Sequence, residues 1–171
     1  MTSAGSDATN HADVDDPSTV EAVVFDLGGV LVDWDPRYVL AADEVVALDI
    51  DGVQRQLDLG VPVAQVQAAW RRAYPDRTQR IDRYFDRWHD TVAGPLAATV
   101  EVLDDLRARP VQLYALSNFS SELFRQVRHR FDFVEWFDGL VISGDEGVIK
   151  PDPQIYRLLI DRYDLRPSST V

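Results

Sequence analysis

Three polar residues occupy positions where chemistry is readily done in an α/β protein, at or just past the ends of apolar segments. Asp26 follows one apolar run, Ser117 ends a second, and Lys150 lies beyond a third. A carboxylate can act as a nucleophile, a hydroxyl can hold a phosphoryl oxygen, and an ammonium can neutralise carboxylate and phosphate together. Their order along the chain predicts one site that handles a phosphoryl group.

The immediate neighbours of these residues fit the same interpretation. Gly28 and Gly29 follow Asp26, and adjacent glycines let the backbone come close to a ligand. Asn118 follows Ser117 and could supply a further hydrogen bond, and Lys150 is the only lysine among seventeen basic residues. Taken singly, each feature also has a structural interpretation as a turn cap, a turn or a helix start.

The surrounding sequence predicts strands that alternate with helices. Continuous apolar runs indicate strands covered on both faces, and the alternation favours an α/β fold with a parallel, Rossmann-like sheet. In such a sheet the carboxyl ends of the strands meet at one crevice. The expected strands are 22–25, 111–116 and 140–142, with a further strand beginning at 168–171; the expected helices are 97–108, 122–130 and 153–163, and 143–147 is expected to be a loop.

Residues 37–93 show helical spacing of apolar residues and predict a helical insert after the first strand. We therefore expect an acidic disordered tail at 1–20, a core made of 21–33 and 96–171, and a helical cap at 34–95. The arginines of the cap helices alternate with aspartates, which is typical of a solvated, ion-paired face. The alternative is that one or two of them line a pocket for an anionic substrate. Trp34, Trp70 and Trp88 are further candidates for that pocket.

Composition excludes several classes of protein. The net charge is −12, so a general basic surface for nucleic acid or anionic membranes is not expected. No apolar run approaches 18 residues, and no secretory signal precedes the core. Cysteine is absent, which excludes thiolate chemistry and suits a cytoplasmic location. The sequence predicts no oligomeric state.

Three segments resemble the first three motifs of the haloacid dehalogenase (HAD) superfamily. They are Phe25-Asp-Leu-Gly-Gly-Val-Leu-Val-Asp-Trp-Asp-Pro36, Leu116-Ser-Asn118 and Lys150-Pro-Asp-Pro153. The resemblance covers residues 22–171 and is strongest to sugar-phosphatase-like members, including glucose-1-phosphate phosphatases. It implies a Rossmann-like core with a small helical cap, and Mg²⁺-dependent phosphoryl transfer from a small phosphorylated metabolite.

The resemblance also implies roles for individual residues. Asp26 would be the nucleophile that forms an aspartyl-phosphate, and its carboxylate and the Gly28 carbonyl would ligate Mg²⁺. Ser117 would bind the transferring phosphoryl group, with Asn118 and the backbone at Gly28 and Gly29 nearby. Lys150 would steady the Asp26 carboxylate and the phosphate.

The chain departs from the family pattern at position 28. Many family phosphatases carry there a second Asp that serves as general acid and base, a role that contributes roughly 10²–10⁴-fold. Gly28 therefore predicts either an activated leaving group, such as an anomeric sugar phosphate, or a substitute acid. Asp33 and Asp35 are the candidates for that acid, although both could simply cap the first cap helix.

The fourth family motif, which supplies acidic Mg²⁺ ligands, is not found before Val171. We therefore expect weak Mg²⁺ binding, an unpaired edge on the first strand, and little or no phosphatase activity from the 171-residue chain. Two alternatives stay open beside the phosphatase. One is a truncated, non-catalytic binding or interaction module, and the other is a dehalogenase-type carbon–halogen hydrolase, which usually has a bulkier residue at position 28.

Overall fold

A three-stranded parallel sheet forms the centre of the computed structural model, which describes residues 20–171. Its strands are β1 (Ala22–Phe25), β4 (Gln112–Ser117) and β5 (Gly139–Ile142), in the order β1-β4-β5. The predicted α/β fold class is thereby confirmed. The predicted acidic tail lies, through residue 19, outside the described residues.

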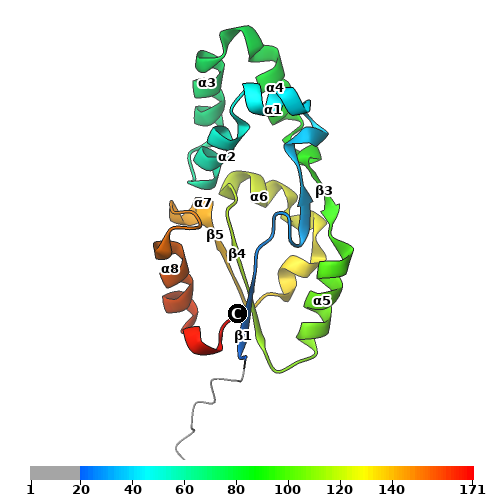
Figure 1. Cartoon of the computed structure of the whole chain (residues 1–171), viewed down its shortest axis with the longest axis vertical. Helices are drawn as coiled ribbons and strands as arrows, with labels where there is room; N and C mark the ends of the chain where they lie inside the picture. The colour runs from blue at the N-terminus through cyan, green and yellow to red at the C-terminus, as the bar shows by residue number, and fades with distance from the viewer. Residues whose placement is uncertain (1–19) are drawn as a thin grey trace, which may run out of the picture.

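The central strand β4 is buried on both faces because helices cover each of them. Alternate residues point to opposite sides, so Leu113 and Ala115 pack in one apolar cluster and Tyr114 and Leu116 in another. Helix α5 (Ala97–Arg107) contributes to the first cluster and α8 (Pro153–Tyr163) to the second, and the two helices flank the sheet in Figure 1. Both helices match the sequence-based predictions.

The remaining elements of the core are short. Helix α6 (Ser121–Val127) follows β4, and the segment after β5 forms one helical turn, α7 (Ser143–Glu146), where we expected a loop. That turn ends at Gly147, whose φ of +70° suits glycine. The short 3₁₀ segments are η1 (Pro36–Tyr38), η2 (Pro75–Arg77), η3 (Trp88–Thr91), η4 (Arg128–Arg130), η5 (Asp132–Trp136) and η6 (Pro167–Ser169).

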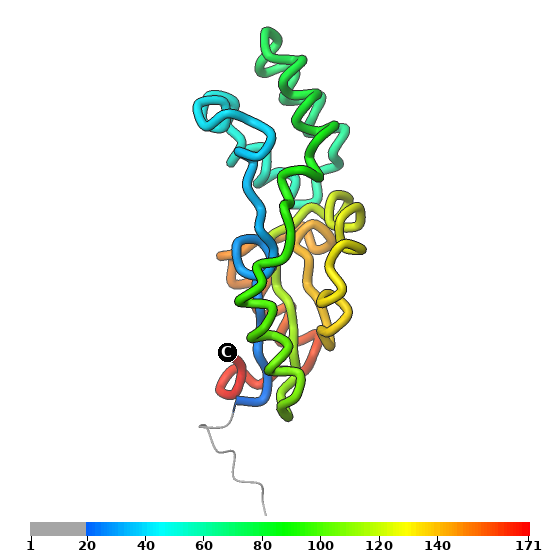
Figure 2. Tube along the Cα trace, turned by 90° about the vertical axis from the view of Figure 1, so that its right-hand side faces the viewer, coloured from blue at the N-terminus to red at the C-terminus, as the bar shows by residue number. Residues whose placement is uncertain are grey.

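Four helices between β1 and α5 form a separate lobe, called here the helical insert. They are α1 (Ala42–Ala47), α2 (Ile50–Asp58), α3 (Val63–Ala73) and α4 (Thr78–Asp86). Figures 1 and 2 show the insert beyond the carboxyl ends of the sheet strands. No helix among residues 20–171 is long and apolar enough to cross a bilayer.

The insert is joined to the core by a two-stranded antiparallel ribbon that the sequence did not predict. Strands β2 (Val32–Trp34) and β3 (Val92–Pro95) pair at the two junctions of the expected core with the expected cap, where no strand was predicted. Each strand is only three or four residues long, so its alternation is too brief to be recognised.

The outer edge of β1 is partly covered, so the prediction of an unpaired edge is wrong over Ala22–Val24. Val24 N donates to Val171 O at 2.7 Å, and Val171 N donates to Ala22 O at 3.0 Å. Thr170 forms a parallel bridge with Ala22. Of the predicted strand start at 168–171, Thr170 and Val171 pair with the strand that precedes Asp26, whereas Ser168 and Ser169 belong to η6.

Candidate active site

Asp26 and Lys150 form a direct ion pair at the carboxyl end of the sheet. Lys150 Nζ lies 2.9 Å from Asp26 Oδ2 and donates to Leu116 O at 2.7 Å. Leu27 N donates to Asp26 Oδ1 at 2.8 Å. Each carboxylate oxygen is thus oriented, yet 37% of the Asp26 side chain is exposed. The two residues that the sequence singled out therefore meet, and the carboxylate remains reachable by a ligand.

Asn118 holds the backbone of Lys150 in place. Its Oδ1 accepts from Lys150 N at 2.7 Å, and its Nδ2 donates to Lys150 O at 3.0 Å. This two-point contact connects the end of β4 to the loop that carries the lysine. Asn118 also lines the pocket beside Asp26. These hydrogen bonds show that Asn118 orients Lys150, whereas the sequence predicts that Asn118 contacts the substrate.

Ser117 is the last residue of β4 and is 1% exposed. Its Oγ is buried and has no hydrogen-bond partner among the described residues. An unsatisfied buried hydroxyl costs about 1–3 kcal/mol, so native structures rarely keep one without a reason. A phosphoryl oxygen bound at this end of the sheet would supply the missing partner.

The two glycines after Asp26 play different parts. Leu31 N and Val32 N both donate to Leu27 O, at 2.8 and 2.9 Å, so the chain turns back sharply at this point. Gly29 is exposed, and its φ of +75° is the backbone conformation that this turn requires and that glycine adopts readily. Gly28 lines the pocket, with open space where a side chain would stand. Close approach of a ligand is therefore possible at Gly28.

A cavity of about 180 Å³ lies between the core and the helical insert. Its small volume suits a small molecule. Trp34 Nε1 and Gln54 Oε1 are buried polar atoms without hydrogen-bond partners among residues 20–171. The cavity is lined by Asp26, Gly28, Trp34, Gln54, Asp58, Trp88, Asn118 and Phe119.

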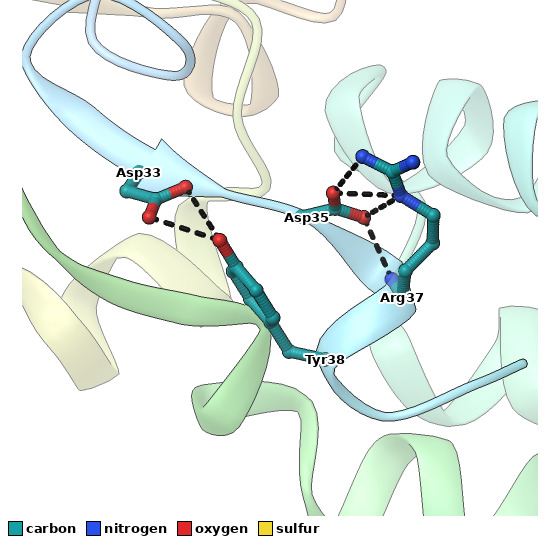
Figure 3. A network of polar contacts seen from close by, with 4 residues as sticks. All are labelled: Asp33, Asp35, Arg37 and Tyr38. Atoms are coloured by element: carbon teal, nitrogen blue, oxygen red, sulfur yellow. Dashed lines mark hydrogen bonds and ion pairs between the residues drawn. The ribbon is translucent and has the colours of Figure 1, made fainter.

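Asp33 and Asp35, the predicted substitute acids, have other partners. Figure 3 shows Asp33 accepting from the Tyr38 hydroxyl, at 2.9 Å to Oδ2, and Asp35 accepting from Arg37 N at 2.8 Å. Arg37 also binds the Asp35 carboxylate and holds its pKa below the usual range. Asp35 is the N-cap of η1, as its structural interpretation predicted. Neither carboxylate lines the cavity beside Asp26.

Asp58, at the end of α2, is the carboxylate that the sequence analysis missed. It is 8% exposed and lines the cavity together with Asp26. Its pKa is raised to about 6: burial is the main cause, the hydrogen bond from Gln54 opposes the rise, and the charge of Asp26 adds to it. The available signal was helical spacing, because Asp58 lies eight residues after buried Ile50, on the apolar stripe of α2.

Three arginines of the helical insert, Arg71, Arg80 and Arg87, form ion pairs, in agreement with the simpler interpretation for these three. Arg71 pairs with Asp82, and Arg87 pairs with Asp90. No arginine is among the residues that line the cavity beside Asp26. Trp34 and Trp88 line this cavity, but Trp70 does not: its Nε1 donates to Leu48 O at 2.7 Å in the insert.

The donor atoms for a divalent cation are few. No cluster of three or more His, Asp or Glu side chains suited to a metal occurs within residues 20–171. The Asp26 carboxylate and the Gly28 backbone nevertheless border one cavity. Mg²⁺ is commonly held by one or two carboxylates together with substrate phosphate and water. One carboxylate is therefore the smallest number with which Mg²⁺ is commonly held, and the residues present, which add one backbone carbonyl, fit this ion.

Several characterised proteins are similar in sequence to this chain. A sesquiterpene phosphatase, AstK of Aspergillus oryzae, is 24% identical over 90% of this chain and 80% of its own length. (S)-2-haloacid dehalogenase 1 of a Pseudomonas species is 28% identical over 87% of this chain and 73% of its own. A phosphorylated carbohydrates phosphatase of Thermotoga maritima is 26% identical over 89% of this chain and 74% of its own length.

Solved structures share the fold. A HAD family enzyme of Bacteroides thetaiotaomicron, in complex with magnesium and inorganic phosphate, superposes with a TM-score of 0.68 and 20% identity. The match covers 88% of this chain and 82% of that one. The family model for haloacid dehalogenase-like hydrolases matches residues 20–171. The chain therefore belongs to the haloacid dehalogenase-like hydrolase family.

Proposed function

We propose that this hydrolase is a Mg²⁺-dependent phosphatase of a small phosphorylated metabolite, with Asp26 as the nucleophile. The observation that carries this proposal is the ion pair between Asp26 Oδ2 and Lys150 Nζ at 2.9 Å, with Asp26 lining a cavity and the unpartnered hydroxyl of Ser117 at the carboxyl end of the neighbouring strand β4. A carboxylate, an ammonium and a free hydroxyl together suit phosphoryl transfer.

In this mechanism Asp26 attacks the phosphorus atom of the ester and forms an aspartyl-phosphate, which water then hydrolyses. Lys150 neutralises the negative charge shared by the carboxylate and the phosphoryl oxygens, and Ser117 Oγ donates to one of those oxygens. Mg²⁺, held by the Asp26 carboxylate and the Gly28 carbonyl, would further screen the repulsion between carboxylate and phosphate.

A sugar phosphate is the substrate class that the cavity favours. Trp34 Nε1 offers a donor and Gln54 Oε1 an acceptor, and both lack protein partners. A hydroxyl group can both donate and accept a hydrogen bond, so a substrate with several hydroxyl groups fits the Trp34 donor and the Gln54 acceptor. The indoles of Trp34 and Trp88 supply apolar walls. The phosphorylated carbohydrates phosphatase among the relatives supports the same class.

We also propose a division of labour along the chain. Residues 21–33 and 96–171 act as the phosphoryl-handling core, and residues 34–95 act as a cap that encloses the alcohol part of the substrate. The position of the helical insert at the carboxyl end of the sheet supports this role (Figure 1). A cytoplasmic location, and the absence of nucleic-acid partners, stay predictions from composition.

The test is phosphate release by the purified protein from a panel of sugar phosphates, with and without Mg²⁺. Because few donor atoms hold the cation and the sequence predicts little phosphatase activity from the 171-residue chain, we expect only slow Mg²⁺-dependent release. Asp26→Asn should abolish that release, and protein quenched with acid during turnover should carry a phosphorylated Asp26. Asp33→Asn is the matched control, because Asp33 is a carboxylate with its own partner outside the cavity. Equal release by wild type and Asp26→Asn would contradict the proposal.

Two other outcomes would identify the alternatives. Metal-independent halide release from 2-chloropropionate, with no phosphate release, would indicate a carbon–halogen hydrolase. Binding of Mg²⁺ and phosphate, seen as a rise in melting temperature without turnover of any ester, would indicate a binding module. The glycine at position 28 favours the phosphatase, because the family's dehalogenases usually carry a bulkier residue there.

A further inference from the structure

A phosphatase of this type needs a proton donor that position 28 cannot provide, since a glycine stands there. The ester oxygen leaves as an alkoxide unless it receives a proton, and general acids contribute roughly 10²–10⁴-fold to such steps. Asp33 and Asp35 have other partners and do not line the cavity. The donor must therefore be sought elsewhere around Asp26.

We propose that Asp58 of the helical insert is the general acid and base of the reaction, a role that rests on the phosphatase function proposed above. Asp58 and Asp26 line the same cavity from opposite lobes. Gln54 Nε2 donates to Asp58 Oδ1 at 2.8 Å, which orients the carboxyl group. Within residues 20–171 no donor is bonded to Oδ2, so this oxygen is available to the substrate.

The corner of the insert that carries Asp58 is fixed to the core. Ser143 Oγ donates to Asp58 O at 2.6 Å and accepts from Phe119 N at 3.0 Å. Gly60 packs so closely that a Cβ built on it would lie 2.3 Å from Gly144 O, and its φ is +81°. A side chain at position 60 would separate the two lobes. The geometry thus holds Asp58 at a defined place beside the nucleophile.

The surroundings of Asp58 suit proton exchange near neutral pH. Burial is the main cause of the raised pKa of Asp58, the hydrogen bond from Gln54 opposes it, and the negative charge of Asp26 adds to it, so that the pKa is about 6. The other titratable group that interacts with Asp58 is Tyr84 of α4, whose own pKa is raised by burial and by the Asp58 charge. A carboxyl group with a pKa close to the working pH can both give and take a proton.

The proposed steps balance as follows. Asp26 Oδ2 bonds to phosphorus, the phosphorus–oxygen ester bond breaks, and the ester oxygen keeps the electron pair and takes the proton of Asp58. The alcohol departs and leaves aspartyl-phosphate and ionised Asp58. Water then attacks phosphorus while Asp58 takes its proton. The bond between phosphorus and Asp26 breaks, which releases phosphate and restores both carboxyl groups to their starting states.

The test compares Asp58→Asn with wild type on two esters that differ in leaving group. An alkyl phosphate needs a proton on its leaving oxygen, whereas p-nitrophenyl phosphate does not. We expect kcat/KM for the alkyl ester to fall by roughly 10²–10⁴-fold and kcat/KM for p-nitrophenyl phosphate to change little. In wild type, kcat/KM for the alkyl ester should decline as pH rises through about 6. This decline should disappear in Asp58→Asn.

Retained p-nitrophenyl phosphate hydrolysis serves as the internal check that the variant folds. Ser143→Ala is a second variant: it acts through position, so it should lower alkyl-ester activity while the pH profile is kept. Equal losses of Asp58→Asn on both esters, or no loss on either, would overturn the role of Asp58 alone. Absence of Asp26-dependent hydrolysis of either ester in wild type would overturn the proposed function and this role with it.

Discussion

Replacement of Asp58 by Asn should stabilise the protein at alkaline pH and do so less at acid pH. Asp58 is 8% exposed, and its pKa rises from 3.8 in the unfolded chain to about 6 in the fold. Between pH 3.8 and about 6, the Asp58 carboxyl group therefore keeps its proton in the folded state but has lost it in the unfolded state. Stability from this group is complete below 3.8 and is lost as pH rises through 6.

The magnitude follows from the difference between the two pKa values. At about 1.36 kcal/mol per pH unit, the rise from 3.8 to about 6 makes ionised Asp58 cost up to about 3 kcal/mol at pH 8. At pH 4.5 only about 1 kcal/mol of that cost is present. The advantage of Asp58→Asn over wild type should therefore be about 2 kcal/mol larger at pH 8 than at pH 4.5.

Urea unfolding at the two pH values measures this difference directly. Thermal melts should show it as a gain of about 4–8 °C for a chain of this size. Asp35→Asn is the control of opposite sign, because Arg37 holds the Asp35 pKa low. Loss of Asp35 should cost stability at pH 8, and that cost should shrink as pH falls toward 3. An advantage of Asp58→Asn that does not vary with pH would refute the reasoning.

Three further predictions concern the core and the contact between the lobes. Ser117→Ala should raise stability by about 1 kcal/mol, because it removes an unsatisfied buried hydroxyl, yet lower kcat/KM by roughly 10²-fold; urea unfolding and phosphate release measure the two effects. Lys150→Met should lower phosphate release by roughly 10²–10³-fold, and Lys150→Arg should not restore it, because a planar guanidinium differs in shape from an ammonium. Gly60→Ala should lower the free energy of unfolding by roughly 1–3 kcal/mol, since φ is +81° and Gly144 O is in the way; Gly94→Ala, at a position with open space, is its control.

The phosphoryl-handling half of the candidate site could be predicted because its residues follow strands. Apolar runs in parallel sheets are easily recognised, and their carboxyl ends must converge. Asp26 and Lys150 lie more than one hundred residues apart in the chain, yet the topology brings them to 2.9 Å. Phe25, the last residue of β1, pairs with Ala115, two residues before the end of β4. These facts depend on backbone pairing, which local patterns indicate well.

The insert half could not be predicted in the same way. Whether Asp33, Asp35 or Asp58 faces the cavity depends on how the insert docks on the core, and no local pattern specifies docking. The β2–β3 ribbon was missed because its strands have only three and four residues, too few for an alternation to be recognised. Pairing of Thr170 and Val171 with β1 depends, as the docking does, on a contact between distant parts of the chain.

The groups proposed to act in the reaction come from both the core and the helical insert. In the proposed mechanism the sheet carries the group that bonds to phosphorus, and residues 50–60 carry Asp58 and Gln54, which line the same cavity as Asp26. If Asp58 is the proton donor proposed above, a change within this short segment alters both the choice of alcohol and the acidity of that donor. Phosphoryl handling on the sheet is left intact. Exchange of one short segment between relatives would thus be enough to create a new substrate range, and each exchange would also reset the pH at which the enzyme works best.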